Sequence, residues 1–348
     1  MLPKKRFLSL NQTFNFVPDF LQDLKVWCNT CQKNISPPWL LKRTPVEVEL
    51  GINGQVWVPA STNFECQHCN TTITLQLPQV KQTSRYTFFG DEAHRTTGNL
   101  WLTTYSLVGA LHRDRDKFND QILQLKQEVE PSLSPEAWKI HMKEIMSGQE
   151  RNKHPVFSSW DRNRVNSLCD GIFDLIKNYG PAIMVANASC IFHLPRNARN
   201  ISRTKETVRN DVYLGLITTI IDMATRCGVR PVFAFDGEVR RKNGTYATPW
   251  ASDVFHGAKL NLVFPFIARG ILIEEPKIVV PGSYPGAELA DFVSFVIARF
   301  LYKKLRNEEI DLDPKRFGKI IYVGFTPTGD ILERNLDRYP WREFFIDG

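Results

Sequence analysis

The sequence predicts an α/β protein in which a small β module precedes a larger domain of mixed strands and helices. Three observations support this prediction. Two Cys-x-x-Cys pairs flank short alternating strands near the N-terminus. Later in the chain, short apolar runs typical of buried strands alternate with longer segments of helical periodicity. Several of the apolar runs are followed by an acidic residue. We therefore place the small module at residues 1–82 and the larger domain at residues 83–348.

The composition is that of a globular chain. Of its 348 residues, 43% are hydrophobic and 23% are charged, which allows a sizeable core. The formal net charge of +7 favours an acidic partner such as nucleic acid. No apolar run is long enough to predict a membrane span, and the basic N-terminus lacks the apolar core of a secretory signal. We expect a cytoplasmic protein that does not associate with membranes.

The two cysteine pairs, Cys28-Asn-Thr-Cys31 and Cys66-Gln-His-Cys69, predict a zinc site. Each pair can place two thiolates on a tight turn, and four thiolates complete the tetrahedral sulfur site that suits zinc. Residues 46–50 and 56–58 alternate as strands around an Asn-Gly hairpin signal, and residues 71–77 alternate again. This order is typical of a zinc ribbon, and four Cys ligands predict structural zinc. The alternatives are a redox dithiol or unrelated buried cysteines.

The elements of the larger domain follow from apolar periodicity and from turn residues. Pro131 ends the first predicted helix, and Gly228 is the expected C-cap of a later one. The predicted strands cover residues 86–90, 100–111, 181–187, 231–237, part of 271–280, and 317–324. The predicted helices cover residues 114–130, 160–179, 208–227, 258–266, and the nearly all-apolar part of segment 283–299, which begins with helix-start residues.

Acidic residues recur beside these buried elements. Asp91 and Glu92 follow the first strand, Asp236 ends a later strand, and Glu288 and Asp291 share one face of the last helix. Carboxylates that converge at one sheet edge can hold Mg²⁺ or Mn²⁺, ions that activate water in phosphodiester cleavage. In a regular strand, however, only one of Asp91 and Glu92 can face such a site. The alternative is that these acids are ordinary polar strand ends.

Two further groups are candidates for function. His141 and Glu144 are close enough in sequence to share a site, although a solvated pair is the alternative. Basic residues cluster at residues 196–209 and 240–242, where they form either a phosphate-contacting surface or a solvated face. The candidate nucleic-acid-binding residues are Arg199, Arg203, Lys205, Arg240 and Arg241.

Four short motifs give the chain a resemblance to a known family. They are Phe89-Gly-Asp91-Glu92-Ala93-His94, Lys139-Ile-His141-Met142, Phe235-Asp236, and Glu288-Leu-Ala-Asp291-Phe-Val-Ser-Phe-Val-Ile-Ala-Arg299. Over roughly residues 85–303 the chain resembles the prokaryotic family called domain of unknown function 3800, which has a ribonuclease H-like (retroviral-integrase-like) fold. The chain departs from the family pattern in two places, where Ala93-His94 replaces Ser-Gly and Glu288 replaces Gln.

The resemblance implies a ribonuclease H-like mixed sheet flanked by helices, with a metal-dependent nuclease site. Asp91, Asp236 and Asp291 would be Mg²⁺ or Mn²⁺ ligands, with Glu92 and Glu288 as accessory groups. His141 would be a proton donor or a substrate contact, and Asp91 is preferred over Glu92 because the family motif places it first. The resemblance also points to roles in phage defence or mobile elements.

Three functions remain open from the sequence. The first is a Mg²⁺- or Mn²⁺-dependent nuclease whose zinc ribbon contacts nucleic acid or a protein partner. The second is a non-catalytic module that binds nucleic acid or protein and whose acids are structural. The third is a metal hydrolase of small phosphorylated molecules, which the basic stretches make less favourable than a nuclease.

Overall fold

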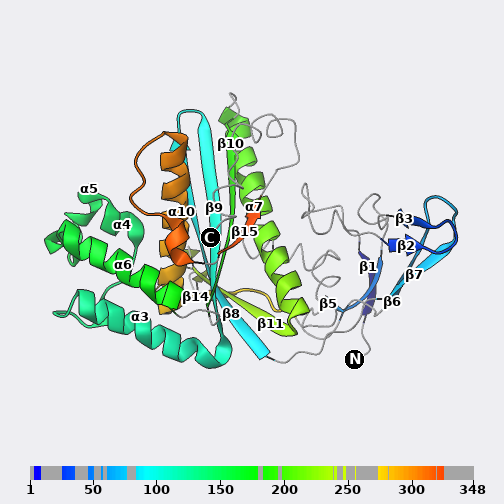
Figure 1. Cartoon of the computed structure of the whole chain (residues 1–348), viewed down its shortest axis with the longest axis horizontal. Helices are drawn as coiled ribbons and strands as arrows, with labels where there is room; N and C mark the ends of the chain where they lie inside the picture. Colours follow the sequence, from blue (N-terminus) through cyan, green and yellow to red (C-terminus); the bar gives the residue numbers. More distant parts are fainter. Residues whose placement is uncertain are drawn as a thin grey trace. The chain divides into compact units, whose positions relative to one another are not determined.

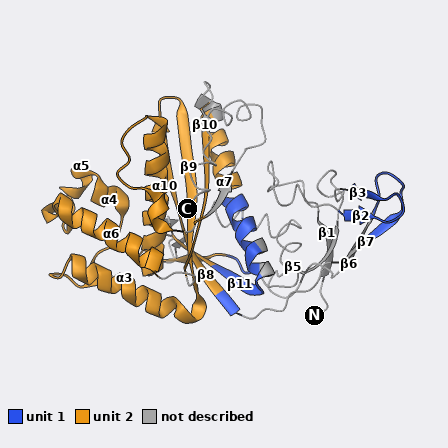
Figure 2. Cartoon of the chain, in the orientation of Figure 1, with its two compact units in different colours: residues 1–85, 213–232, 249–275 blue, residues 86–212, 233–248, 276–348 orange. Residues whose placement is uncertain are grey.

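The computed structural model describes residues 4–8, 26–35, 46–50, 56–57, 61–76, 84–178, 183–194, 198–237, 239–240, 246–247, 255, 273–280, 282–318 and 320–324. The chain forms two compact units, coloured separately in Figure 2. Unit 1 comprises residues 1–85, 213–232 and 249–275, and unit 2 comprises residues 86–212, 233–248 and 276–348. The boundary between residues 82 and 83 stays a prediction.

The cysteine pairs of unit 1 lie on two antiparallel hairpins. Strand β2 (Val26–Cys28) pairs with β3 (Lys33–Ile35), and β6 (Ser61–Glu65) pairs with β7 (Thr72–Gln76). Each tight turn closes with a backbone hydrogen bond of 2.9 Å to the carbonyl of its first cysteine, donated by Gln32 and Asn70 respectively. Both donor residues have positive φ, which is the left-handed geometry that such turns require.

A second sheet of unit 1 has three strands. Strand β4 (Val46–Leu50) lies between β1 (Lys4–Leu8) and β5 (Val56–Trp57). The structure confirms the strands that the sequence predicts near residues 46–50, 56–58 and 71–77, whereas β1 was not predicted. The Asn53-Gly54 turn lies outside the described residues.

Unit 2 is built on a six-stranded mixed sheet whose order is β14-β11-β8-β9-β10-β15 (Figure 1). Strand β9 is antiparallel to both of its neighbours, β8 and β10, while β15 runs parallel to β10 and β14 parallel to β11. The α/β prediction is therefore confirmed. The strands are β8 (Ser84–Thr97), β9 (Leu100–Leu111), β10 (Ile183–His193), β11 (Val229–Asp236), β14 (Lys277–Val279) and β15 (Ile320–Gly324), with a small hairpin of β12 (Val239–Arg240) and β13 (Tyr246–Ala247).

Helices flank this sheet, and α10 packs directly against β9 and α3 (Figure 1). Among the described residues, no helix is both long enough and apolar enough to cross a bilayer. The helices are α3 (Arg115–Val129), α4 (Met142–Met146), α5 (Gly148–Arg151), α6 (Arg162–Asn178), α7 (Ala198–Arg226) and α10 (Pro285–Leu305). Single 3₁₀ turns cover His112–Asp114, Pro135–Ala137, Phe157–Ser159 and Pro314–Phe317.

The first strand is longer than the sequence predicts. We expected it to end at Gly90, but β8 continues to Thr97 because every residue from Asp91 onward has a partner in β9, starting with Ser106 opposite Asp91. Glycine is needed at position 90, since a Cβ there would lie 2.2 Å from Cε1 of Phe235. Asp91 and Glu92 therefore sit within a paired strand rather than at its end.

Helix α10 is anchored on β8 along one face. It begins at Pro285, as the helix-start residues predict, and a Cβ on Gly286 would lie 2.4 Å from the Phe89 ring. Two turns later, the buried Ser294 hydroxyl donates a 2.7 Å hydrogen bond to the carbonyl of Asp91. Asp291 lies on the same helix face, three residues before Ser294, and is thereby brought close to β8.

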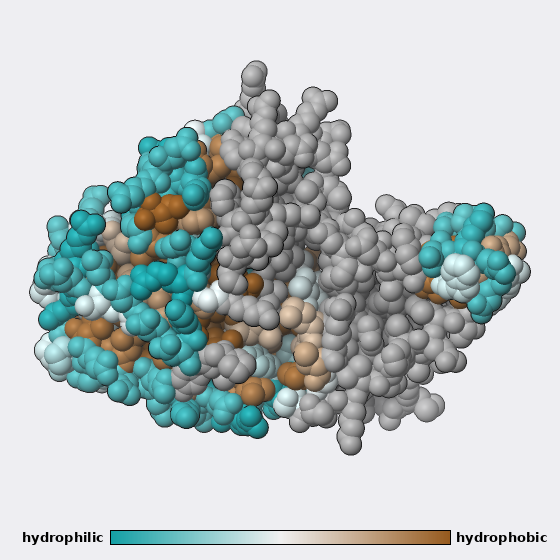
Figure 3. Space-filling model, viewed as in Figure 1, coloured by the Kyte–Doolittle hydropathy of each residue, from teal (hydrophilic) through white to brown (hydrophobic). Residues whose placement is uncertain are grey.

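Helix α7 also begins earlier than predicted, at Ala198 rather than at residue 208. The basic stretch that precedes residue 208 contains no Gly or Pro to interrupt the helix. The predicted helix at residues 258–266 lies outside the described residues. The described surface of unit 2 that faces the viewer in Figure 3 is mainly hydrophilic, with separate hydrophobic patches.

Candidate active site and metal centre

The four predicted zinc ligands are brought together in unit 1. Cys28 Sγ lies 3.6 Å from Cys69 Sγ, and Cys31 Sγ lies 3.7 Å from Cys66 Sγ. The hydrogen bond with the Thr71 side chain lowers the pKa of Cys69 to about 6, which favours a thiolate. All four sulfur atoms lie within 4.8 Å of one another, so the cluster can bind a metal ion such as zinc.

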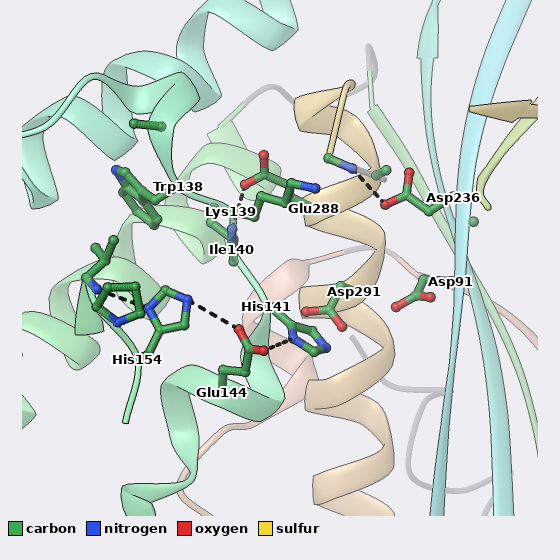
Figure 4. Close-up of a pocket in the computed structure, with 16 residues that line it drawn as sticks. Asp91, Trp138, Lys139, Ile140, His141, Glu144, His154, Asp236, Glu288 and Asp291 are labelled. Atoms are coloured by element: carbon green, nitrogen blue, oxygen red, sulfur yellow. Dashed lines mark hydrogen bonds and ion pairs between the residues drawn. The ribbon is translucent and has the colours of Figure 1, made fainter. Parts of the chain in front are cut away.

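Unit 2 contains a pocket of about 550 Å³ at the junction of β8, β11, α10 and the segment before α4. Three of the predicted acids line it from three different elements: Asp91 from β8, Asp236 from β11 and Asp291 from α10 (Figure 4). Glu288, His141 and Glu144 also line the pocket. Strands and helix thus gather side chains that are far apart in the sequence into one cavity.

Asp91 and Asp291 lie next to one another in the pocket (Figure 4). Their side chains are close enough for their charges to interact, and both residues are partly buried. Burial raises the pKa of both carboxyl groups, and the charge of Asp291 raises the pKa of Asp91 still further. Each of the two groups therefore holds its proton to a higher pH than an ordinary aspartate does.

Asp236 lies on the neighbouring strand. Its Oδ2 accepts a 3.1 Å hydrogen bond from the backbone N–H of Gly282. Burial raises its pKa, whereas that hydrogen bond and the charge of Lys139 oppose the rise. Among the described residues, the four cysteines are the only group of three or more potential ligands within 4.8 Å of one another. The three aspartates share a pocket but not one compact ligand cluster.

Glu288 is part of a buried ion pair. Lys126 Nζ lies 2.9 Å and 3.0 Å from its two carboxylate oxygens, and both side chains are at most 5% exposed. Glu288 Oε2 also accepts a 2.7 Å hydrogen bond from the backbone N–H of Ile140. Both carboxylate oxygens of Glu288 are thus engaged by the protein, and its role as an accessory ligand stays a prediction.

The segment from Trp138 to Met142 forms one wall of the pocket. Its residues alternate, with Trp138, Ile140 and Met142 buried and Lys139 and His141 exposed. Residues 138–141 all line the pocket. The backbone N–H of Met142 donates a 2.7 Å hydrogen bond to Asp291 Oδ2. Two carboxylates of α10, those of Glu288 and Asp291, thus fix this extended segment by its backbone.

Glu92 does not line the pocket. Strand β8 pairs regularly with β9, so Glu92 faces the side of the sheet opposite to Asp91. His94 shares that face, where burial first and then the charges of Arg209 and Lys205 lower its pKa to about 4. Asp91 is therefore the acid of this pair that reaches the pocket.

Of the predicted basic residues, the two whose side chains the structure describes, Arg203 and Lys205, do not line the pocket. Lys205 of α7 lies over the Trp101 ring, 5.3 Å from its centroid, and the Arg203 side chain is exposed. The side chains of Arg199 and Arg240 and the whole of Arg241 lie outside the described residues.

Three residues near the pocket were missed by sequence reasoning: Lys126, Lys139 and His154. Lys126 lies on the apolar face of α3, and a charged residue at such a position indicates a buried partner of opposite charge. The sequence alone could therefore have identified Lys126. Lys139 belongs to the alternating segment beside His141. His154, which lines the pocket from the turn after α5, carried no signal in the sequence.

No protein-family model matches the chain, and no curated protein matches it. The ribonuclease H-like resemblance therefore stays a prediction.

We predict about one zinc ion per purified chain, lost on Cys66→Ser substitution. Losing one of four thiolates removes a bond that holds both hairpins together. Elemental analysis and thermal unfolding would measure the loss of metal and of stability. Cys227→Ser is the matched control, because Cys227 is exposed and outside the cluster. A chain that folds without metal and is unaffected by chelators would contradict the prediction.

We predict that Lys126→Met destabilises the fold by about 3–5 kcal/mol, because it leaves the buried Glu288 carboxylate without its cation. Urea unfolding would measure the change. Lys117→Met, at an exposed position of the same helix, should change stability by less than about 0.5 kcal/mol. Adding Glu288→Leu to Lys126→Met should restore part of the loss, since it removes the orphaned charge. Equal effects of the two Lys variants would refute this account.

We predict that Asp91→Asn stabilises the metal-free chain at neutral pH, by on the order of 1 kcal/mol. The pKa of Asp91 is higher in the folded than in the unfolded chain, so the wild type loses stability as pH rises from the unfolded pKa through the folded one. The free energy of unfolding, measured in the presence of a chelator between pH 5 and 8, should therefore be higher for Asp91→Asn than for the wild type. This difference should grow as the pH rises. Asp120→Asn, on the exposed face of α3, should show no such trend.

Proposed function

We propose that unit 2 hydrolyses phosphodiester bonds of nucleic acid with a divalent cation held by Asp91, Asp236 and Asp291. The observation that carries the proposal is the close approach of two partly buried carboxyl groups, those of Asp91 and Asp291, which come from two different elements. Buried acids so close together repel one another when ionised, and a cation would turn that cost into attraction.

The residues fit Mg²⁺ or Mn²⁺ by their chemistry. All three donors are carboxylate oxygens, which hard cations prefer, and Mg²⁺ commonly keeps several of its waters instead of using an all-protein cage. Such incomplete protein ligation suits aspartates that share a pocket without forming a compact cluster. When bound, the cation would supply an activated water and charge stabilisation for the leaving oxygen.

The chain's own groups have distinct tasks in this proposal. Asp291 is oriented by the N–H of Met142 and Asp236 by the N–H of Gly282, so both carboxylates are held by backbone. Lys139 brings a positive charge to the pocket wall, where a phosphate would otherwise meet mainly acids. His141 is positioned to contact the substrate or to move a proton.

The sheet order supports a ribonuclease H-like fold for unit 2, the fold that the sequence resemblance implies. The first strand of this sheet, β8, lies between β9 and β11, so the strands that carry Asp91 and Asp236 are neighbours. Zinc held by the cysteine cluster would have a structural role in unit 1, where the hairpins could contact nucleic acid or a protein partner.

One observation favours a second function, a non-catalytic binding module. Asp236, Glu288 and Asp291 each accept a hydrogen bond from a backbone N–H, which is what acids with a purely structural role would do. The close approach of Asp91 and Asp291 weighs against this reading, because two partly buried carboxylates so near one another are destabilising unless a proton or a cation lies between them.

Cleavage assays test the proposal. The purified chain should cleave DNA or RNA with Mg²⁺ or Mn²⁺ and lose that activity in chelator. Asp91→Asn and Asp291→Asn should each reduce cleavage by at least about 10²-fold, since each removes a charged ligand. Asp120→Asn serves as the control acid. Nucleic-acid binding without cleavage under any divalent cation would favour the binding module, and unchanged activity in both variants would remove these residues from the site.

A further inference from the structure

The His154 ring is held by its surroundings in one protonation form. Its Nδ1 accepts hydrogen bonds from the backbone N–H groups of Val156 and Phe157, at 3.2 Å and 3.4 Å. The ring also stacks on Phe157, with centroids 4.0 Å apart and planes 14° from parallel. Because Nδ1 accepts two N–H groups, the ring proton is on Nε2.

Glu144 lies between His154 and His141 (Figure 4). His154 Nε2 is 3.7 Å from Glu144 Oε2, an electrostatic contact longer than a direct hydrogen bond. Glu144 Oε1 is 3.3 Å from His141 Nδ1. A carboxylate can only accept, so a neutral His141 in this contact would carry its proton on Nδ1, and its Nε2 would keep a lone pair.

His141 lies on the pocket wall that faces the aspartates. Figure 4 shows its ring between Glu144 and Asp291, and its charge influences Asp291. An imidazole whose Nδ1–H is held by a carboxylate while its Nε2 faces substrate is the arrangement that serves as a general base in hydrolases. A solvated His–Glu pair would not need a second histidine whose own proton is fixed by two backbone groups.

We propose that His141 is the general base of the proposed hydrolysis, and that Glu144 and His154 are positioning residues that fix its tautomer. This inference rests on the proposed function. His141 Nε2 takes a proton from the attacking water as its oxygen bonds to phosphorus. The phosphorus–oxygen bond on the opposite side breaks, and the leaving oxygen takes a proton from solvent. The proton on His141 then returns to solvent.

The decisive variant is Glu144→Gln. The His154 Nε2–H attracts the amide oxygen, so the amide NH₂ faces His141 Nδ1 and moves the imidazole proton to Nε2. Such a tautomer error lowers turnover by about 10²–10⁴-fold. His154→Phe keeps the stacking on Phe157 and removes the N–H, and alone it should lower turnover by about tenfold or less.

The double variant, Glu144→Gln with His154→Phe, gives the sharp result. Without the His154 N–H, the new amide is free to rotate and offer its oxygen to His141, so the second substitution should raise turnover by about tenfold over Glu144→Gln alone. If Glu144 and His154 only stabilised the fold, the turnover of the double variant would be equal to or lower than that of Glu144→Gln. Glu150→Gln, exposed on the adjacent helix, is the control.

Nitrogen NMR of His141 gives a readout independent of turnover. The proton should be on Nδ1 in the wild type, on Nε2 in Glu144→Gln, and again on Nδ1 in the double variant. Two results overturn the proposal that Glu144 and His154 fix the tautomer of His141. One is a proton on Nε2 in the wild type, and the other is a proton that stays on Nε2 in the double variant. The expected tautomers together with no hydrolysis by the wild type under any cation overturn the general-base role and the proposed function.

Discussion

Two carboxylates on one face of α10 hold the pocket wall in place by its backbone. Glu288 and Asp291 accept the N–H groups of Ile140 and Met142, alternate residues of one extended segment. That segment turns its other side chains, including His141, toward the cavity. The two acids differ in what surrounds them, because Lys126 neutralises Glu288 whereas Asp291 meets a second carboxylate. Both acids therefore secure the wall, but only Glu288 is neutralised by a cation of the described chain, while Asp291 lies beside another carboxylate in the pocket.

Much of the fold could be predicted, because local patterns decide it. The stripe of apolar residues in α3, the apolar runs of β9 and β11, and the Pro at the start of α10 are all readable within a few residues. The cysteine cluster was predictable for the same reason, since each tight turn carries two ligands. Three aspartates of the pocket were also found, because each follows or lies within a strongly apolar element.

The rest depends on pairings between distant parts of the chain. Strand β8 passes through a polar stretch because β9 supplies partners, and no pattern within β8 records them. Lys126 and Glu288 are far apart in sequence, so neither residue alone identifies the ion pair. His154 is fixed by backbone groups, which have no signature in the sequence. Sequence patterns located the acids but not the groups that orient them.

The regular alternation of β8 also limits how this chain can diverge. Asp91 faces α10 while Glu92 faces the side of His94, so adjacent residues belong to different chemical environments. Inserting one residue into the strand before Asp91 would exchange these two faces. A bulge in β8 would have to absorb the extra residue for Asp91 to keep facing the pocket.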